Sequence, residues 1–119
     1  MKESIIKRKS FLFSARIFKL HNYLVNSKKE YAVSRQLLKS GTSVGANVRE
    51  AEHAESDKDF IHKLSVAQKE ANESLFWLEL LQETEYLKDD QFNSIYQEAE
   101  EIKKIITAII LTMKSKLNE

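Results

Sequence analysis

Apolar residues recur along this chain every three or four positions, which is the period of an amphipathic helix. The pattern predicts helices over residues 4–26, 28–54, 57–83 and 89–117, and no stretch alternates as a half-buried strand does. Each apolar stripe predicts the face that its helix turns to a shared core. The predicted core positions are Ile6, Phe13, Ile17, Leu20, Leu24, Leu37, Gly41, Val44, Val48, Ala51, Phe60, Leu64, Ala67, Ala71, Leu75, Leu78, Leu81, Phe92, Ile95, Ala99, Ile102, Ile106, Ile109 and Met113.

The connections between the predicted helices are short, so consecutive helices must turn back on each other. Ser27 and Glu30 have the spacing of a capping box at the start of the second helix, and Ser56 is the expected N-cap of the third. With 119 residues, the chain predicts one all-α domain, an antiparallel up-down-up-down four-helix bundle. A long helical hairpin that buries its apolar face only by oligomerising is the alternative architecture.

The only two glycines, Gly41 and Gly45, lie inside the second predicted helix, where each costs roughly 1 kcal/mol relative to alanine. Close backbone approach to a neighbouring helix would offset that cost. Counting outward from the turn near residue 55 places Gly41 opposite Ala71, and Val44 opposite Ala67. We therefore expect the glycines to face these alanines across the seam between helices 28–54 and 57–83. A helix bend at the glycines is the alternative.

Two polar residues, Asn47 and Glu50, border the apolar stripe of the same helix. Polar side chains at a helix–helix seam more often set the register of packing than perform chemistry. We expect Asn47 and Glu50 to take that structural role beside the glycines.

The composition is that of a water-soluble domain, with 42% hydrophobic and 31% charged residues. The chain has no cysteine, which is consistent with a reducing cytoplasm, and its first residues lack the pattern of a signal peptide. Its longest apolar run, residues 105–113, is too short to cross a bilayer core of ~30 Å. We expect a cytoplasmic protein without membrane association.

The net charge of +1 conceals a division between the two halves of the chain. Residues 1–49 carry eleven lysines and arginines against two acidic residues, a net charge of +9. Residues 50–119 carry eight against sixteen, a net charge of −8. Such a division indicates a charged partner, self-association of unlike faces, or both.

Basic residues on the first two predicted helices form the strongest candidate site. Several phosphates neutralised together would give salt-dependent binding of RNA or DNA, whereas interleaved exposed aromatic residues, which favour single strands, are not evident. Ordinary solvated charge is one alternative; the other is contact between the basic surface of one copy and the acidic surface of the next, which closes into a ring if the rotation permits. The candidate nucleic-acid-binding residues are Lys28, Arg35, Lys39, Arg49, Lys9, Arg16 and Lys19.

Signals of catalysis are weak. Glu50 with His53, and Asp59 with His62, have the carboxylate-x-x-His spacing of di-iron bundles, but both pairs flank a turn instead of the middle of a core. No phosphate-binding loop or dinucleotide fingerprint is present. We expect no enzymatic activity, metal, cofactor or small-molecule substrate.

The segment SRQLLKSGTSVGANVREAEHAESDKDFIHKLSVAQKEANESLFWLELLQET, residues 34–84, strongly resembles the bacterial 23S rRNA intervening-sequence protein family. Its most specific pieces are SGTSVGAN, REA, DF, KL, A-x-KEA-x-E and WLELL. The family also resembles the accessory protein of diversity-generating retroelements. The resemblance implies a four-helix bundle assembled into a homopentameric ring, with a basic surface that binds RNA or DNA. A scaffold or adaptor ring without nucleic-acid binding is the alternative function.

Overall fold

The protein forms four long helices in the computed structural model, which describes residues 4–118. They are α1 (Ile5–Lys28), α2 (Ala32–Glu52), α3 (Asp57–Glu83) and α4 (Asp89–Leu117), and the described residues contain no strand. The prediction of an all-α fold with four helices is confirmed. The bounds of α3 and α4 coincide with the predicted ones, whereas α2 is shorter at both ends.

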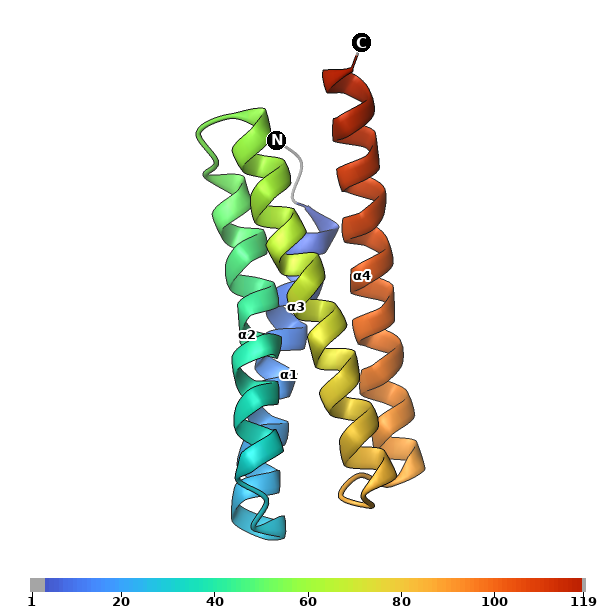
Figure 1. Ribbon diagram of the computed structural model, residues 1–119. Coiled ribbons are helices and arrows are strands. Elements are labelled where there is room, and N and C mark those ends of the chain that lie inside the picture. The colour runs from blue at the N-terminus through green and yellow to red at the C-terminus, as the bar shows by residue number, and fades with distance from the viewer. Residues whose placement is uncertain (1–3, 119) are drawn as a thin grey trace.

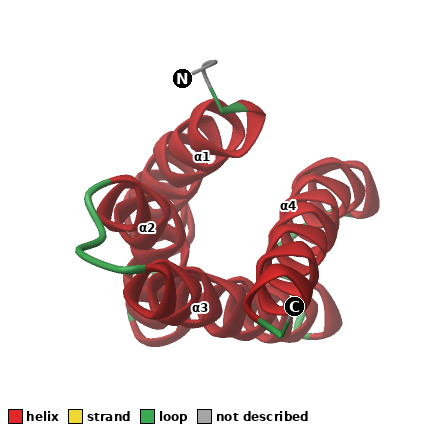
Figure 2. Ribbon diagram, turned by 90° about the horizontal axis from the view of Figure 1, so that it is seen from above, coloured by secondary structure: helices red, strands yellow, loops and turns green. Residues whose placement is uncertain are grey.

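The helices lie side by side in an elongated body of 51 × 23 × 21 Å, and the chain reverses direction at each connection (Figure 1). Seen along the helices, α1, α2, α3 and α4 follow one another around an arc, and α1 and α4 are its two ends (Figure 2). Between α3 and α4, Gln68 bonds to Thr107 and Lys103 bonds to Asn72. Residue numbers thus rise on one helix as they fall on the other, so this pair is antiparallel.

Serine side chains start two of the helices. The Ser4 hydroxyl accepts a hydrogen bond from the N–H of Lys7 at 3.3 Å, and the Ser56 hydroxyl accepts one from the N–H of Asp59 at 3.0 Å. Each bond satisfies an amide that has no partner within the first turn of its helix. The predicted N-cap at Ser56 is confirmed.

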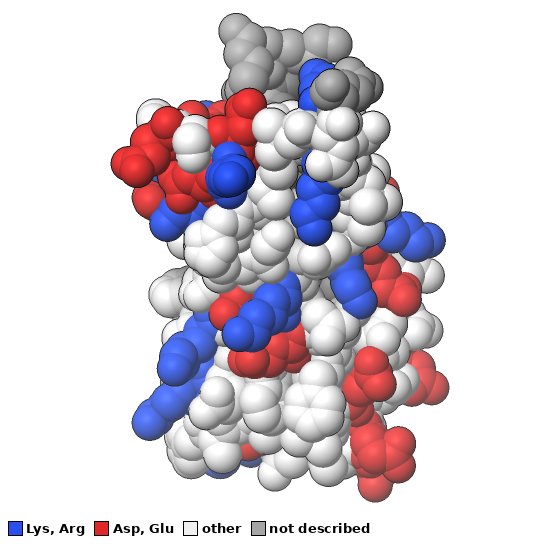
Figure 3. All heavy atoms as spheres, turned by 45° about the horizontal axis from the view of Figure 1, so that its top comes forward, with Lys and Arg blue, Asp and Glu red and all other residues white. Residues whose placement is uncertain are grey.

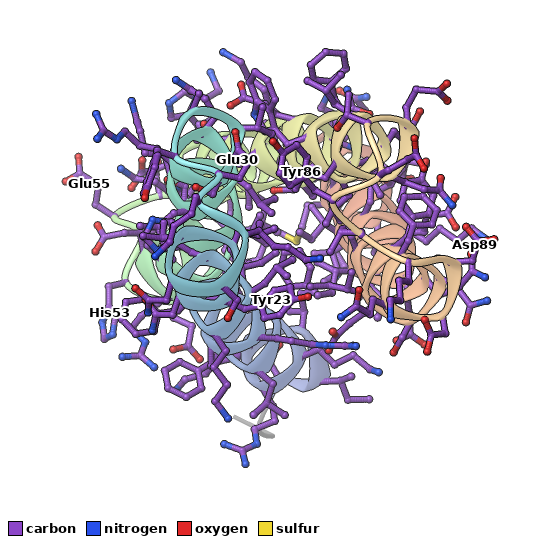
Figure 4. The ribbon with its side chains drawn as sticks, turned by 90° about the horizontal axis from the view of Figure 1, so that it is seen from below. Tyr23, Glu30, His53, Glu55, Tyr86 and Asp89 are labelled. Carbon is purple, nitrogen blue, oxygen red and sulfur yellow. The ribbon has the colours of Figure 1, made fainter. Side chains whose placement is uncertain are left out.

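The connection between α1 and α2 differs from the predicted capping box. Ser27 lies inside α1, and Lys29 closes that helix in a left-handed conformation with φ 58°. The buried Glu30 carboxylate then accepts hydrogen bonds from the N–H groups of Val33 at 3.0 Å and Ser34 at 2.7 Å. Figure 4 shows Glu30 at this connection. Glu30 therefore caps the start of α2 without Ser27.

The predicted apolar stripes form the core, and four of their residues are less buried than expected. Leu20 and Phe60 are only half-buried, and so are Ile109 and Met113 near the end of α4, where Ile110 is the buried residue. Phe60, Ile109 and Met113 line a cavity of 550 Å³ at the end of the bundle that holds the α2–α3 turn. The core therefore thins at this end.

The two glycines lie at the seam between α2 and α1. A Cβ atom on Gly41 would lie 2.7 Å from the side chain of Ile17, and one on Gly45 would lie 2.5 Å from Ser14 Oγ. Ser14 Oγ also donates to Gly41 O at 2.9 Å and accepts from Gly45 N at 3.2 Å. The absence of side chains thus lets a hydroxyl of α1 reach the backbone of α2.

The expectation that the glycines face Ala67 and Ala71 is therefore wrong, although both alanines are fully buried. The α2–α3 seam instead contains a contact between Ser40 Oγ and Ser74 Oγ at 2.9 Å. An internal helix of a bundle buries a face wide enough to meet two neighbours. Its apolar spacing identifies that face, but it does not tell which edge meets which neighbour.

The polar residues expected to set the register of this seam do not cross it. The Asn47 amide donates to Ser43 O within α2 at 2.9 Å, and Glu50 is exposed. Among the described residues, neither makes a hydrogen bond to α3. Their proximity to the apolar stripe had suggested a contact that the orientation of α2 does not allow.

Candidate nucleic-acid interface

Three basic side chains form an exposed stripe along α2. Arg35, Lys39 and Arg49 are all exposed, and none of them belongs to the helix face that is buried against α1 and α3. Arg35 and Arg49 are fourteen residues apart, a distance of about 21 Å along a helix. Within the described chain, no ion pair involves these three residues. The α2 stripe of Arg35, Lys39 and Arg49 is therefore available to a partner.

Lys28 and Lys19 are also exposed, but both belong to α1. The prediction placed Lys28 at the start of the second helix, residues 28–54. That placement is wrong because α2 begins only at Ala32, after the turn at Lys29. Lys28 instead occupies the last turn of α1, where a positive charge interacts favourably with the helix dipole.

Two of the predicted binding residues are held by α4. Lys9 Nζ lies 2.7 Å from Glu101 Oε1, and Arg16 Nη1 lies 3.1 Å from Glu98 Oε1. Arg16 also donates to Ser94 Oγ at 2.7 Å. These contacts tie α1 to α4 across the bundle. Lys9 and Arg16 are therefore not free for phosphate contacts in this structure.

Some of the basic residues of the first half of the chain are thus paired with acidic residues of the second half within the same molecule. A third ion pair joins Lys7 of α1 to Glu52 of α2 at 3.1 Å. On the face that Figure 3 shows, acidic side chains gather at the upper left, in a patch near the middle and along the right edge, with basic side chains between them. The acidic half of the chain is therefore divided into separate clusters.

Lys39 lies close enough to α3 to affect a carboxyl group there. Burial raises the pKa of Glu70, and the charge of Glu73 raises it further, whereas Lys69 and Lys39 act in the opposite direction. The positive stripe on α2 thus borders a partly buried acidic pair on α3. This acidic pair marks the limit of the basic surface on that side.

Exposed aromatic rings accompany the basic residues, contrary to the sequence-based expectation. Phe11 is 49% exposed and Phe18 is 53% exposed, and Ala15 between them is exposed as well. The guanidinium carbon of Arg49 lies 5.6 Å from the centroid of the Phe11 ring, which is within cation–π range. The sequence did carry a signal for these rings, because Phe11, Ala15, Phe18 and Val25 form a second apolar stripe beside the predicted core positions of the same helix.

A hollow of 350 Å³ lies between α1 and α2, and Arg49 of the α2 stripe belongs to its lining. Phe11 lines one side of it, and Arg49 belongs to the α2 side. We call it the α1–α2 hollow, and its lining residues are Lys7, Phe11, Ser14, Thr42, Gly45, Ala46, Arg49 and Glu50.

Among residues 4–118, no cluster of three or more histidine and acidic side chains is placed to hold a metal ion. His53 and Glu55 lie at the outer edge of the bundle (Figure 4). None of the helices in the described part of the chain is long and apolar enough to span a bilayer.

Comparison with known proteins identifies a family and a similar solved structure. The description of the matching family is 23S rRNA-intervening sequence protein, and the match covers residues 2–108. A crystal structure from Bacteroides thetaiotaomicron, of a protein with unknown function from the S23 ribosomal protein family, is 52% identical with a TM-score of 0.88. The alignment covers 89% of this chain and 98% of that one. No curated protein matches the chain.

Proposed function

The chain belongs to the 23S rRNA-intervening sequence protein family, and from that premise we propose that it binds RNA or DNA without catalysing a reaction. The binding surface is the outer side of α1 and α2, in a cytoplasmic protein. One observation carries the proposal: Arg35, Lys39 and Arg49 are exposed along about 21 Å of α2 with no ion pair among the described residues. Such a row can neutralise several phosphates together.

Charge reversal of this row tests the proposal. The variant Arg35→Glu, Lys39→Glu, Arg49→Glu should lose binding to RNA and DNA while its helical circular dichroism spectrum persists. The slope of the logarithm of the binding constant against the logarithm of the salt concentration reports the number of phosphate contacts. Its magnitude should fall by about one for each contact removed. Unchanged affinity in this variant would contradict the proposal.

The matched control reverses three exposed lysines outside this surface, Lys58, Lys69 and Lys104. It changes the net charge by the same amount on α3 and α4. If both triple variants lose affinity equally, the attraction depends on net charge and the α2 stripe has no special role.

We further propose that copies of this up-down-up-down bundle assemble into a ring, a homopentamer by family resemblance. Phe76 on α3 is 56% exposed and Leu111 on α4 is 63% exposed, and Leu111 borders a groove of 390 Å³ between these helices. Large exposed apolar side chains are frequent at contacts between copies. Light scattering should give a mass above that of one chain, and a monomer at working concentration would contradict this.

A scaffold or adaptor ring without nucleic-acid binding is the second candidate function. The opposite charges of the α1–α2 surface and of the acidic clusters on α3 and α4 favour it. In that arrangement the charges join one copy to the next. High salt should then dissociate the oligomer, because exposed charges are screened beyond about 10 Å at 0.1 M salt. A ring that is indifferent to salt would count against this function.

A further inference from the structure

We propose that the α1–α2 hollow holds an unpaired nucleobase, so that the protein recognises RNA or DNA where the strand is single. This inference rests on the proposed nucleic-acid binding and names the class of strand. The rings of Phe11 and Phe18 are exposed, and packing of the bundle core does not explain their presence on the surface.

The two rings are placed to follow a strand. Phe11 and Phe18 are seven residues apart on one helix, about 10.5 Å along its axis. That distance corresponds to about three nucleotides at the stacked spacing of 3.4 Å. The small side chain of Ala15 leaves the surface between them open. A base has a flat π face whatever its identity, so such rings bind single strands with little sequence preference.

The hollow suits an uncharged base better than a phosphate. The charges in its lining largely balance one another. Arg49 and Glu50 have opposite charges, and Lys7 is neutralised by its ion pair with Glu52. The volume of 350 Å³ lies at the small end of the range of about 300–1,000 Å³ for small-molecule sites. A base in the hollow would meet the Phe11 ring and the Arg49 guanidinium, both of which stack on bases.

The phosphates would lie on the charges around the hollow. Arg8 on α1 and Arg35 and Lys39 on α2 are exposed outside its lining. The Thr42 hydroxyl inside the hollow donates to Leu38 O at 2.7 Å, so its lone pairs remain available to accept from a base amino group. The surface thus combines neutral stacking groups with flanking cations.

A duplex and a second copy of the chain fit these observations less well. Bases in a duplex are covered on both faces by their neighbours, so a duplex would leave the two rings without partners. A second copy could bring acidic groups to these cations, but carboxylates would leave the faces of the two exposed rings without a stacking partner.

The test compares an unstructured single-stranded RNA of mixed sequence with a fully paired duplex of the same length, and the DNA counterparts are measured alongside. The wild-type chain should bind the single strand more tightly. Phe11→Ala and Phe18→Ala should each weaken single-strand binding by about 5- to 100-fold, with little change in the salt dependence. Leu12→Ala removes an exposed apolar side chain without an aromatic ring from the same helix and should leave the affinity unchanged.

A fluorescence measurement reports the contact directly. Trp77 is the only tryptophan, so Phe11→Trp in a Trp77→Phe background places a single indole at the hollow. Single-stranded RNA should quench its emission by stacking and retain the affinity of the wild type. Phe76→Trp in the same background should not be quenched. Absence of quenching at Phe11→Trp under saturating RNA would overturn the inference.

The outcomes separate the inference from the function beneath it. Equal affinity for both strand forms, unaffected by Phe11→Ala, overturns the inference and leaves nucleic-acid binding in place. No binding of either form overturns both. If Phe11→Ala and Phe18→Ala instead lower the mass of the assembly in analytical ultracentrifugation, the rings belong to a contact between copies and the inference is wrong.

Discussion

Helix α1 meets its two neighbours in different ways. Against α2, it packs at glycine positions, and the Ser14 hydroxyl bonds to the backbone of Gly41 and Gly45. Against α4, it is held by long charged side chains, with Lys9 and Arg16 each paired to a glutamate. The α1–α2 seam requires that Gly41 and Gly45 carry no side chain, whereas the α1–α4 seam depends on ion pairs that are partly exposed to water. The first should therefore tolerate substitution poorly and the second well.

The largest effect is expected at Gly41. Even a Cβ atom would lie 2.7 Å from Ile17, and Gly41→Val adds two further carbons, so α1 must move away from α2. Overpacking of this kind costs about 1–3 kcal/mol, and sometimes more. Urea unfolding, followed by circular dichroism at fixed protein concentration, measures the change in the free energy of unfolding.

Ala46→Val is the matched control, because Ala46 is exposed on the same helix and its substitution should cost less than about 1 kcal/mol. Adding Ile17→Ala to Gly41→Val should also recover part of the loss, because the two residues are in contact. Equal stability of Gly41→Val and the wild type would show that α1 does not approach α2 there.

A smaller loss is expected at Glu30, which caps α2 next to the α1–α2 seam. Glu30→Ala removes the acceptor for the N–H groups of Val33 and Ser34 and should cost about 1–2 kcal/mol in the same unfolding measurement. Glu30→Gln keeps one acceptor oxygen and should cost less. Glu85→Ala removes an exposed glutamate elsewhere on the chain. An equal loss of unfolding free energy in that variant would show that capping is not the cause.

The ion pair between Arg16 and Glu98 should contribute less still. Both side chains are partly exposed, and such pairs are worth about 0.2–1 kcal/mol. A double-mutant cycle with Arg16→Ala and Glu98→Ala measures the coupling free energy, which should shrink as salt is added. A coupling free energy larger than the cost of Gly41→Val would show that the ion pair contributes more to stability than the glycine packing does.

The smallest effect concerns the α3–α4 seam at alkaline pH. The hydrogen bond from the Tyr96 hydroxyl to Glu79 Oε2, 2.6 Å long, raises the pKa of Tyr96 to about 12, and burial adds to the shift. Because the native state holds this proton more tightly than the unfolded state, its stabilising effect is full below about pH 10 and declines between about pH 10 and 12. Phenolate absorbance should show a transition near pH 12 from Tyr96.

Glu79→Gln is the control for that titration. It removes the carboxylate that accepts from Tyr96, so the phenolate transition of Tyr96 should move to lower pH. An unchanged titration in Glu79→Gln would mean that this bond does not form in solution.

The sequence predicted the helices well because their signals are local. The 3–4 spacing of Phe92, Ile95 and Ala99 identified a buried face that the structure confirms, and the cap at Ser56 needed only the residues that follow it. The candidate site was predicted less well. Arg35 and Lys39 are exposed as expected, whereas Arg16 is occupied by a residue about eighty positions away.

The sequence by itself determined four amphipathic helices, their core faces and the basic character of the first half, because periodicity and side-chain charge are properties of short segments. Only the tertiary structure decided that Gly41 and Gly45 face α1, that Lys9 and Arg16 pair with α4, and that Phe11 and Phe18 remain exposed. These features depend on how each helix is rotated toward two neighbours at once. That rotation is set by packing across the whole bundle, which no single segment encodes.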